Sequence, residues 1–175
     1  AASLITFRRA DWVLTVSKEL GAEQRARYLV AGTGEGKERT MREAKCFCGD
    51  YSVTLEGEPL LVSSCCCTRC QRRTGSFFGV TAYFRPSQMV AQRGEEKTFR
   101  LDDATTRFRQ CARCGTPVWY APDDDSWGED ILGVSGGCFA DPTLPGPHRM
   151  THAATGHPFV TSPKGVPVYE DGPPE

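Results

Sequence analysis

Three observations predict a mainly β protein: a single domain with few short helices, whose distant segments are connected through clustered cysteines. From Ala44 onward, apolar and polar residues alternate with a period of two, as they do in half-buried strands. Glycine and proline, 18 and 12 of the 175 residues, interrupt these runs at short spacing, which favours turns over long helices. Most of the nine cysteines lie in short clusters, so cysteine side chains are the main candidates for functional residues.

The expected strands follow one another along the chain, each bounded by turn residues. The first contains the alternation of Tyr51, Val53 and Leu55. One short helical turn fits within residues 68–74, and the Pro- and Gly-rich tail after residue 142 is expected to wrap the body as extended chain. Strands this close in sequence favour a sandwich-like or barrel-like body. The further strand candidates span 60–64, 77–84, 88–92, 97–101, 107–111, 118–120 and 131–135.

Residues 1–40 differ from the rest and are predicted to be an N-terminal extension to a domain spanning residues 41–175. This stretch has no cysteine, and its apolar pattern fits a helix or a strand. Gly32–Gly36 is typical of a flexible joint. Two interpretations stay open: an ordinary ordered extension, or a piece upstream of an internal start site at Met41.

Charge and hydropathy argue against several classes of protein. The formal net charge is −1, from 21 basic and 22 acidic residues, so no bulk attraction to nucleic acid or anionic membrane is expected. The apolar runs are too short to span a bilayer, and Arg8, Arg9 and Asp11 interrupt any signal-peptide core. The odd cysteine count also fits poorly with a complete disulfide framework. We therefore expect a cytoplasmic protein with no membrane or nucleic-acid partner.

Four cysteines form two pairs that can supply a closed metal shell. Cys46 and Cys48 form C-x-C, while Cys111 and Cys114 form C-x-x-C. Side chains two apart on extended chain share one face, and a glycine directly after each pair permits the backbone conformation of a tight turn. Four thiolates satisfy the tetrahedral preference of zinc. The spacing predicts a structural zinc, with free thiols or an iron site as the alternatives.

A second group offers only three ligands from one short segment. Cys65, Cys67 and Cys70 form C-x-C-x-x-C. Catalytic zinc sites hold the metal by three protein ligands and leave the fourth position for water or substrate. A thiol that binds at such a position loses its proton. The triplet is therefore the candidate catalytic centre.

The neighbours of the triplet allow more than one interpretation. Arg69, Arg72 and Arg73 either offset the charge of the thiolates and grip a substrate carboxylate, or are solvated surface groups. Cys66 points away from its two neighbours on extended chain and is expected to be a small apolar filler. The alternative is that Cys66 or Cys138 supplies a fourth ligand and closes the site. The three histidines of the tail are assigned no metal role.

The order and spacing of seven cysteines resembles the glutathione-dependent formaldehyde-activating enzyme family, which includes centromere protein V. The resemblance covers about residues 44–170 and implies a zinc-stapled β fold called a β-tent. One departure is that the middle residue of the triplet's C-x-C, often His in the family, is Cys66 here. The matching segments are Cys46–Gly49, Cys65–Cys70 followed by Gly75 and Ser76, and Cys111–Pro117, with weaker similarity at 137–142 and 165–167.

The resemblance implies a carbon–sulfur lyase that joins glutathione, or another thiol, and formaldehyde to give S-hydroxymethylglutathione. An alternative is a non-catalytic zinc module that binds a thiol or a protein partner. The family's two zinc sites, one structural and one catalytic, would fall here on Cys46, Cys48, Cys111 and Cys114, and on Cys65, Cys67 and Cys70, respectively.

Overall fold

The computed structural model describes residues 40–127 and 131–172, and it confirms the predicted mainly β fold with few short helices. The helical elements are α3 (Thr68–Thr74) and the single turns η1 (Pro86–Gln88), η2 (Asp125–Trp127), η3 (Gly136–Cys138) and η4 (Ala153–Thr155). The strands are β1 (Met41–Lys45), β2 (Ser52–Glu56), β3 (Leu61–Cys65), β4 (Gly79–Phe84), β5 (Met89–Arg93), β6 (Glu96–Arg100), β7 (Thr106–Cys111), β8 (Pro117–Pro122), β9 (Leu132–Ser135) and β10 (Arg149–Thr151).

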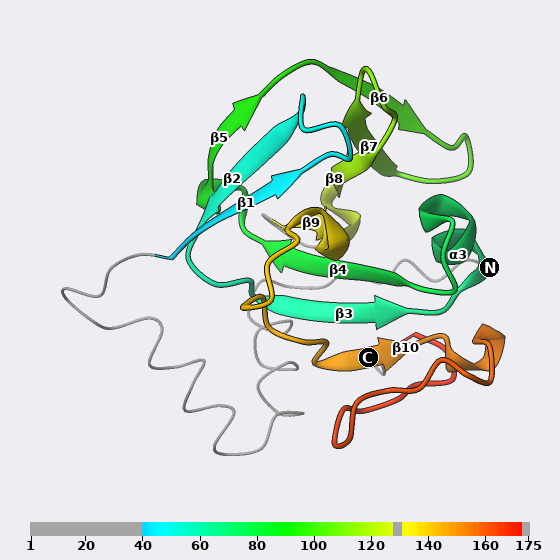
Figure 1. Ribbon diagram of the computed structural model, residues 1–175. Coiled ribbons are helices and arrows are strands. Elements are labelled where there is room, and N and C mark those ends of the chain that lie inside the picture. The colour runs from blue at the N-terminus through cyan, green and yellow to red at the C-terminus, as the bar shows by residue number, and fades with distance from the viewer. Residues whose placement is uncertain (1–39, 128–130, 173–175) are drawn as a thin grey trace.

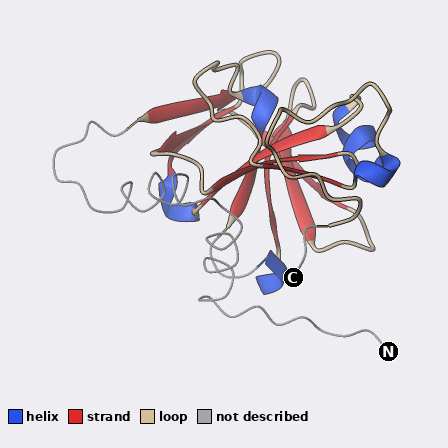
Figure 2. Ribbon diagram, turned by 90° about the horizontal axis from the view of Figure 1, so that it is seen from below, coloured by secondary structure: helices blue, strands red, loops and turns tan. Residues whose placement is uncertain are grey.

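The strands form two sheets (Figure 1). The smaller sheet has the order β1-β2-β5, and the larger has the order β10-β3-β4-β9-β8-β7-β6. Neighbouring strands are antiparallel except for β10, which runs parallel to β3. Figure 2 shows the strands running through the middle of the molecule with the short helices at its margins.

The hydrophobic core draws on both sheets, which explains the period of two in the sequence. The inward-facing side chains of the two sheets form one buried cluster. Fully burying an aliphatic side chain of this size contributes roughly 1.5–3 kcal/mol, so this shared core contributes substantially to stability. Its members include Val53, Leu55, Val62, Phe84, Val118 and Val134.

The tail forms more regular structure than the sequence predicts. Strand β10 pairs with β3, bringing Thr151 opposite Cys65. The amide N–H of Cys66 donates to the carbonyl of Thr151 at 2.9 Å, which extends this pairing beyond β3. The returning chain then bonds to β10 in turn, with the N–H of Tyr169 donating to the carbonyl of Met150 at 2.9 Å. The tail therefore fixes the segment that carries the triplet.

A buried arginine that the sequence does not reveal connects β1 to the segment after η3. Arg42 is 5% exposed. Its guanidinium donates to both carboxylate oxygens of Glu58, at 2.8 and 2.9 Å, and to Asp141 at 2.6 Å. Two carboxylates offset the cost of burying this charge.

The predicted extension, apart from Thr40, lies outside the described residues, and the domain boundary at residue 41 stays a prediction. Across residues 40–127 and 131–172, no helix has the length and apolar character needed to cross a membrane.

Candidate metal centres

Two similar turns carry the four cysteines of the first group, which we call the quartet. In the β1–β2 turn, the N–H of Gly49 donates to the carbonyl of Cys46 at 3.0 Å; in the β7–β8 turn, Gly115 donates to Cys111 at 3.0 Å. Both glycines have positive φ, +82° and +72°, a conformation that costs other residues free energy. The predicted role of the two glycines is confirmed.

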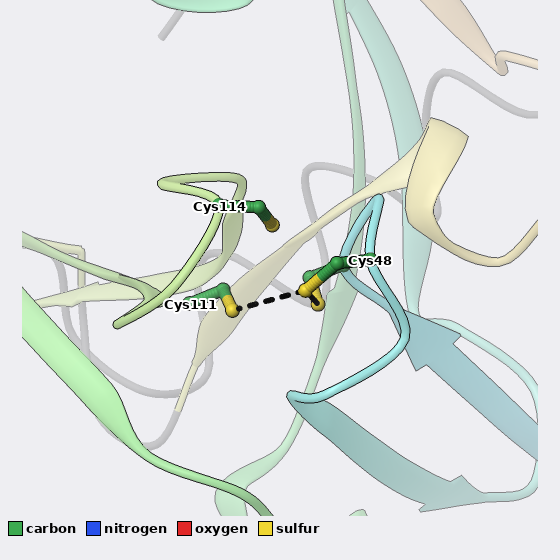
Figure 3. Close-up of side chains that lie close together, drawn as sticks. Cys48, Cys111 and Cys114 are labelled. Atoms are coloured by element: carbon green, nitrogen blue, oxygen red, sulfur yellow. Dashed lines mark hydrogen bonds between the residues drawn. The ribbon is translucent and has the colours of Figure 1, made fainter.

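The quartet sulfurs converge as a tetrahedral site requires. All four lie within 4.8 Å of one another. The sulfurs of Cys46 and Cys48 are 3.5 Å apart. Those of Cys48 and Cys111 are 3.7 Å apart, and Figure 3 shows both side chains turned toward each other. Four sulfurs at about 2.3 Å from a central zinc ion lie about 3.8 Å from each other. The donor set and its spacing therefore fit zinc, and all nine cysteines are free of disulfide bonds.

Other contacts also connect the two turns of the quartet. The hydroxyl of Thr116 lies 3.2 Å from the sulfur of Cys114 and accepts from the N–H of Phe47 at 3.2 Å. Arg113 donates to Asp50 across the turns at 2.8 Å. The hydrogen bond from Thr116 lowers the pKa of the Cys114 thiol to about 5, which favours the thiolate that a metal binds.

The three sulfurs of the second group, the triplet, come together at the junction of β3 and α3. Cys65 ends β3, Cys67 caps the N-terminus of α3, and Cys70 lies in its first turn. The sulfur of Cys67 accepts a hydrogen bond from the N–H of Cys70 at 3.4 Å. All three sulfurs lie within 4.8 Å of one another, and all three residues are half-buried.

The thiols of the triplet share protons unequally. A hydrogen bond from the Cys70 thiol lowers the pKa of Cys65 to about 5, while the same bond raises the pKa of Cys70. Soft sulfur ligands at this spacing suit zinc. Among the residues that the structure describes, no fourth His, Cys, Asp or Glu atom joins the group. The triplet thus has the donor count of an open site.

Cys66 and Cys138, which sequence analysis leaves as possible fourth ligands, belong to neither group. Cys66 is 1% exposed, as expected of a filler. Its carbonyl accepts from Gln71 Nε2 at 2.7 Å and from Thr155 Oγ1 at 3.0 Å. Cys138 donates weakly to the carbonyl of Pro117 at 3.8 Å, and burial raises its pKa to about 11.

The three arginines beside the triplet have different surroundings, which sequence reasoning could not separate. Arg69 is exposed and donates to Asp103 at 2.5 Å. Arg72 is exposed, and Arg73 is half-buried against aromatic rings.

This arrangement defines a class of protein: a two-sheet β body with one four-sulfur and one three-sulfur group, each suited to a metal ion. The chain belongs to the glutathione-dependent formaldehyde-activating enzyme family, whose family model matches residues 41–157. All seven grouped cysteines lie within that range.

Two further comparisons concern solved structures and curated proteins. A crystal structure of a Rhodobacter sphaeroides protein is similar at 19% identity, with a TM-score of 0.45 over 59% of this chain and 90% of that chain. No curated protein matches the chain.

Proposed function

We propose that the protein is a zinc-dependent carbon–sulfur lyase that joins glutathione, or a similar small thiol, to formaldehyde and forms S-hydroxymethylglutathione. The observation that carries this proposal is the three-sulfur triplet beside a complete four-sulfur quartet. Membership of the family supports the choice of substrates. Both sites lie in the proposed domain, residues 41–175.

Each cysteine group has a separate task in this proposal. Cys46, Cys48, Cys111 and Cys114 hold a structural zinc, and Cys65, Cys67 and Cys70 hold a catalytic one. A zinc ion held by the triplet would supply Lewis acidity, which would lower the pKa of a thiol bound to it. The fold keeps the three sulfurs aligned, because β10 holds the end of β3 and Cys67 caps α3.

The proposed reaction is an addition that needs no oxidant or reductant. The substrate thiol gives up its proton, and a sulfur electron pair forms the C–S bond to the carbonyl carbon of formaldehyde. The π electron pair of the C=O bond moves to oxygen, which takes up a proton to become the hydroxyl of the product. Cys65, Cys67 and Cys70 would hold the metal that positions the substrate thiol, which reduces the entropic cost of bringing the reactants together.

The proposed location is the cytoplasm, because both cysteine groups need reduced thiols and glutathione is itself a cytosolic reductant. The net charge of −1 supports small-molecule substrates over nucleic acid or anionic membrane.

The test measures how fast glutathione and its formaldehyde adduct interconvert, using exchange NMR at equilibrium, since the reaction also proceeds without enzyme. We expect the exchange rate to rise linearly with protein concentration. Cys67→Ser should abolish the increase, while Cys66→Ala, which removes a thiol from the same segment but outside the triplet, should keep it. A rate equal to the spontaneous one would refute the lyase proposal. Thiol binding without any increase would favour the alternative of a non-catalytic zinc module.

A further inference from the structure

We propose that Arg73 is the anchor for a carboxylate of the incoming thiol, so that the triplet site selects anionic thiols over neutral ones. This inference rests on the proposed function and specifies its substrate class. Three observations support it: the position of the guanidinium, the aromatic rings that hold it, and its lack of a carboxylate partner among the described residues.

The guanidinium of Arg73 lies directly beside the triplet. Gly79 is the register partner of Cys65 across the β3–β4 pairing. A Cβ atom on Gly79 would lie 3.0 Å from Nη2 of Arg73 and 3.4 Å from Cβ of Cys70. The guanidinium and the Cys70 side chain therefore pack against the same side of Gly79, next to the strand position of Cys65.

Aromatic rings from β7 and β8 hold this guanidinium in place. Its Cζ atom lies 4.9 Å from the ring centroid of Tyr120 and 5.5 Å from that of Phe108. Such cation–π contacts fix the position of the charge, but a ring face accepts no conventional hydrogen bond from the guanidinium N–H groups. The side chain is thus positioned while its donors stay available for a ligand.

Arg73 lacks the acidic partner that several other arginines of the fold have. Arg42, Arg69 and Arg107 each form an ion pair with a carboxylate at 2.5–2.8 Å. Within residues 40–127 and 131–172, by contrast, the guanidinium of Arg73 forms neither an ion pair nor a hydrogen bond. A half-buried cation that lies beside the triplet and has no carboxylate partner is suited to bind the carboxylate of a ligand.

The chemistry of the site explains why an anion needs such a partner. Three thiolates and a divalent ion carry a net negative charge, which repels a thiol that has carboxylates of its own. Glutathione has two carboxylates, one on either side of its cysteine. The planar guanidinium fork matches a carboxylate with two parallel N–H···O bonds, and each charge-assisted bond is stronger than a neutral one. By pairing with a carboxylate, Arg73 would offset this repulsion and make the site bind an anionic thiol more tightly than a neutral one.

The test compares two ligands with the same thiol: glutathione and glutathione diethyl ester, in which both carboxylates are replaced by neutral ethyl esters. Calorimetry gives the affinity of each ligand for the zinc-loaded wild type, Arg73→Met and Arg73→Lys. We expect the wild type to prefer glutathione by about tenfold or more and Arg73→Met to lose most of that preference. Arg73→Lys, which keeps the charge but not the fork, should retain a few-fold preference and keeps the test decisive if Arg73→Met does not fold.

Arg72→Met is the matched control, since it removes the same charge from the exposed side of the same helix and should keep the preference. An equal loss of affinity for both ligands in Arg73→Met would overturn the inference, because it would mean that Arg73 only balances the charge of the triplet. So would the absence of any preference in the wild type. The proposed function has its own readout, the sulfur-to-metal absorption band that glutathione adds to the cobalt-substituted protein. Without that band the proposed function fails, whichever ligand Arg73 prefers.

Discussion

The quartet and the triplet both consist of cysteine sulfurs, but they differ in which parts of the chain they connect. The quartet joins two turns that are distant in sequence, since Cys48 and Cys111 are 63 positions apart, and so connects the small sheet to the large one. The triplet lies within a single segment, Cys65–Cys70, which hydrogen bonds to β10 and η4 already hold. Closing a long loop contributes more to folding than closing a short one. A metal ion bound by the quartet should therefore stabilise the fold, whereas the triplet contributes little to folding and can serve in substrate binding and catalysis.

Removal of a quartet ligand should produce the largest effect on folding. Cys111→Ser leaves three sulfurs from two distant turns, one of them buried. We expect the melting temperature to fall by more than about 10 °C, because metal binding and folding are coupled at structural zinc sites. Calorimetry together with metal analysis measures this change. If the melting temperature is unchanged while one zinc is lost, the division of tasks between the two groups is wrong.

A backbone clash next to the quartet should come second. Gly94 has φ +84°, and a Cβ atom there would lie 1.8 Å from the carbonyl oxygen of Asp50, which follows the first quartet turn. We expect Gly94→Ala to lower the free energy of unfolding by about 3 kcal/mol, from backbone strain and the forced displacement of the turn. Gly137→Ala is the control, since a Cβ at Gly137 meets nothing within 4 Å. Urea unfolding compares the two; equal stability would show that the turn shifts freely.

A smaller, pH-dependent effect is expected on the triplet side, at the pairing of the tail with β3. The N–H of Val62 donates to Nδ1 of His148 at 3.0 Å, and burial lowers the pKa of this imidazole. The unfolded chain therefore takes up a proton near pH 6.5 that the folded chain takes up only at lower pH, so stability should decrease as the pH falls through that value.

His148→Asn keeps an acceptor in the position of Nδ1 without a titrating group. Urea unfolding between pH 7.5 and 6 should then show a shallower pH dependence for the variant than for the wild type. The same slope in both proteins would assign the pH dependence to other groups.

The smallest effect on folding should come from the triplet itself. Serine is a preferred helix N-cap, so Cys67→Ser keeps an acceptor for the N–H of Cys70. We expect the melting temperature to stay within about 3 °C of the wild type, with loss of one zinc and of glutathione binding. Metal analysis and calorimetry check both. A large loss of stability would mean that both groups are structural.

The sequence predicted both cysteine groups because their spacing directly limits where the side chains point. The C-x-C and C-x-x-C patterns need only a local turn, and a glycine follows each pair of the quartet. Strand boundaries depended more on context. The expected strand 77–84 begins only at Gly79, because Phe77 packs edge-on against His157 and Phe159 of the tail instead of joining the sheet.

Other features depend on contacts between distant segments and could not be predicted. Strand β10 has three residues in a Pro-rich tail and forms only by parallel pairing with β3. The different surroundings of the arginines also come from elsewhere in the fold: Asp103 precedes β7, while Phe108 and Tyr120 lie on β7 and β8. No local pattern around residues 69–73 contains this information.

The most direct test of the account is zinc X-ray absorption on the fully loaded protein, with and without glutathione. The spectrum reports the number of sulfur atoms per zinc, averaged over the two sites. With four ligands in one group and three in the other, the account predicts a value midway between three and four that rises to four when glutathione binds. Four sulfurs per zinc before any thiol is added, or a value that glutathione leaves unchanged, would contradict it.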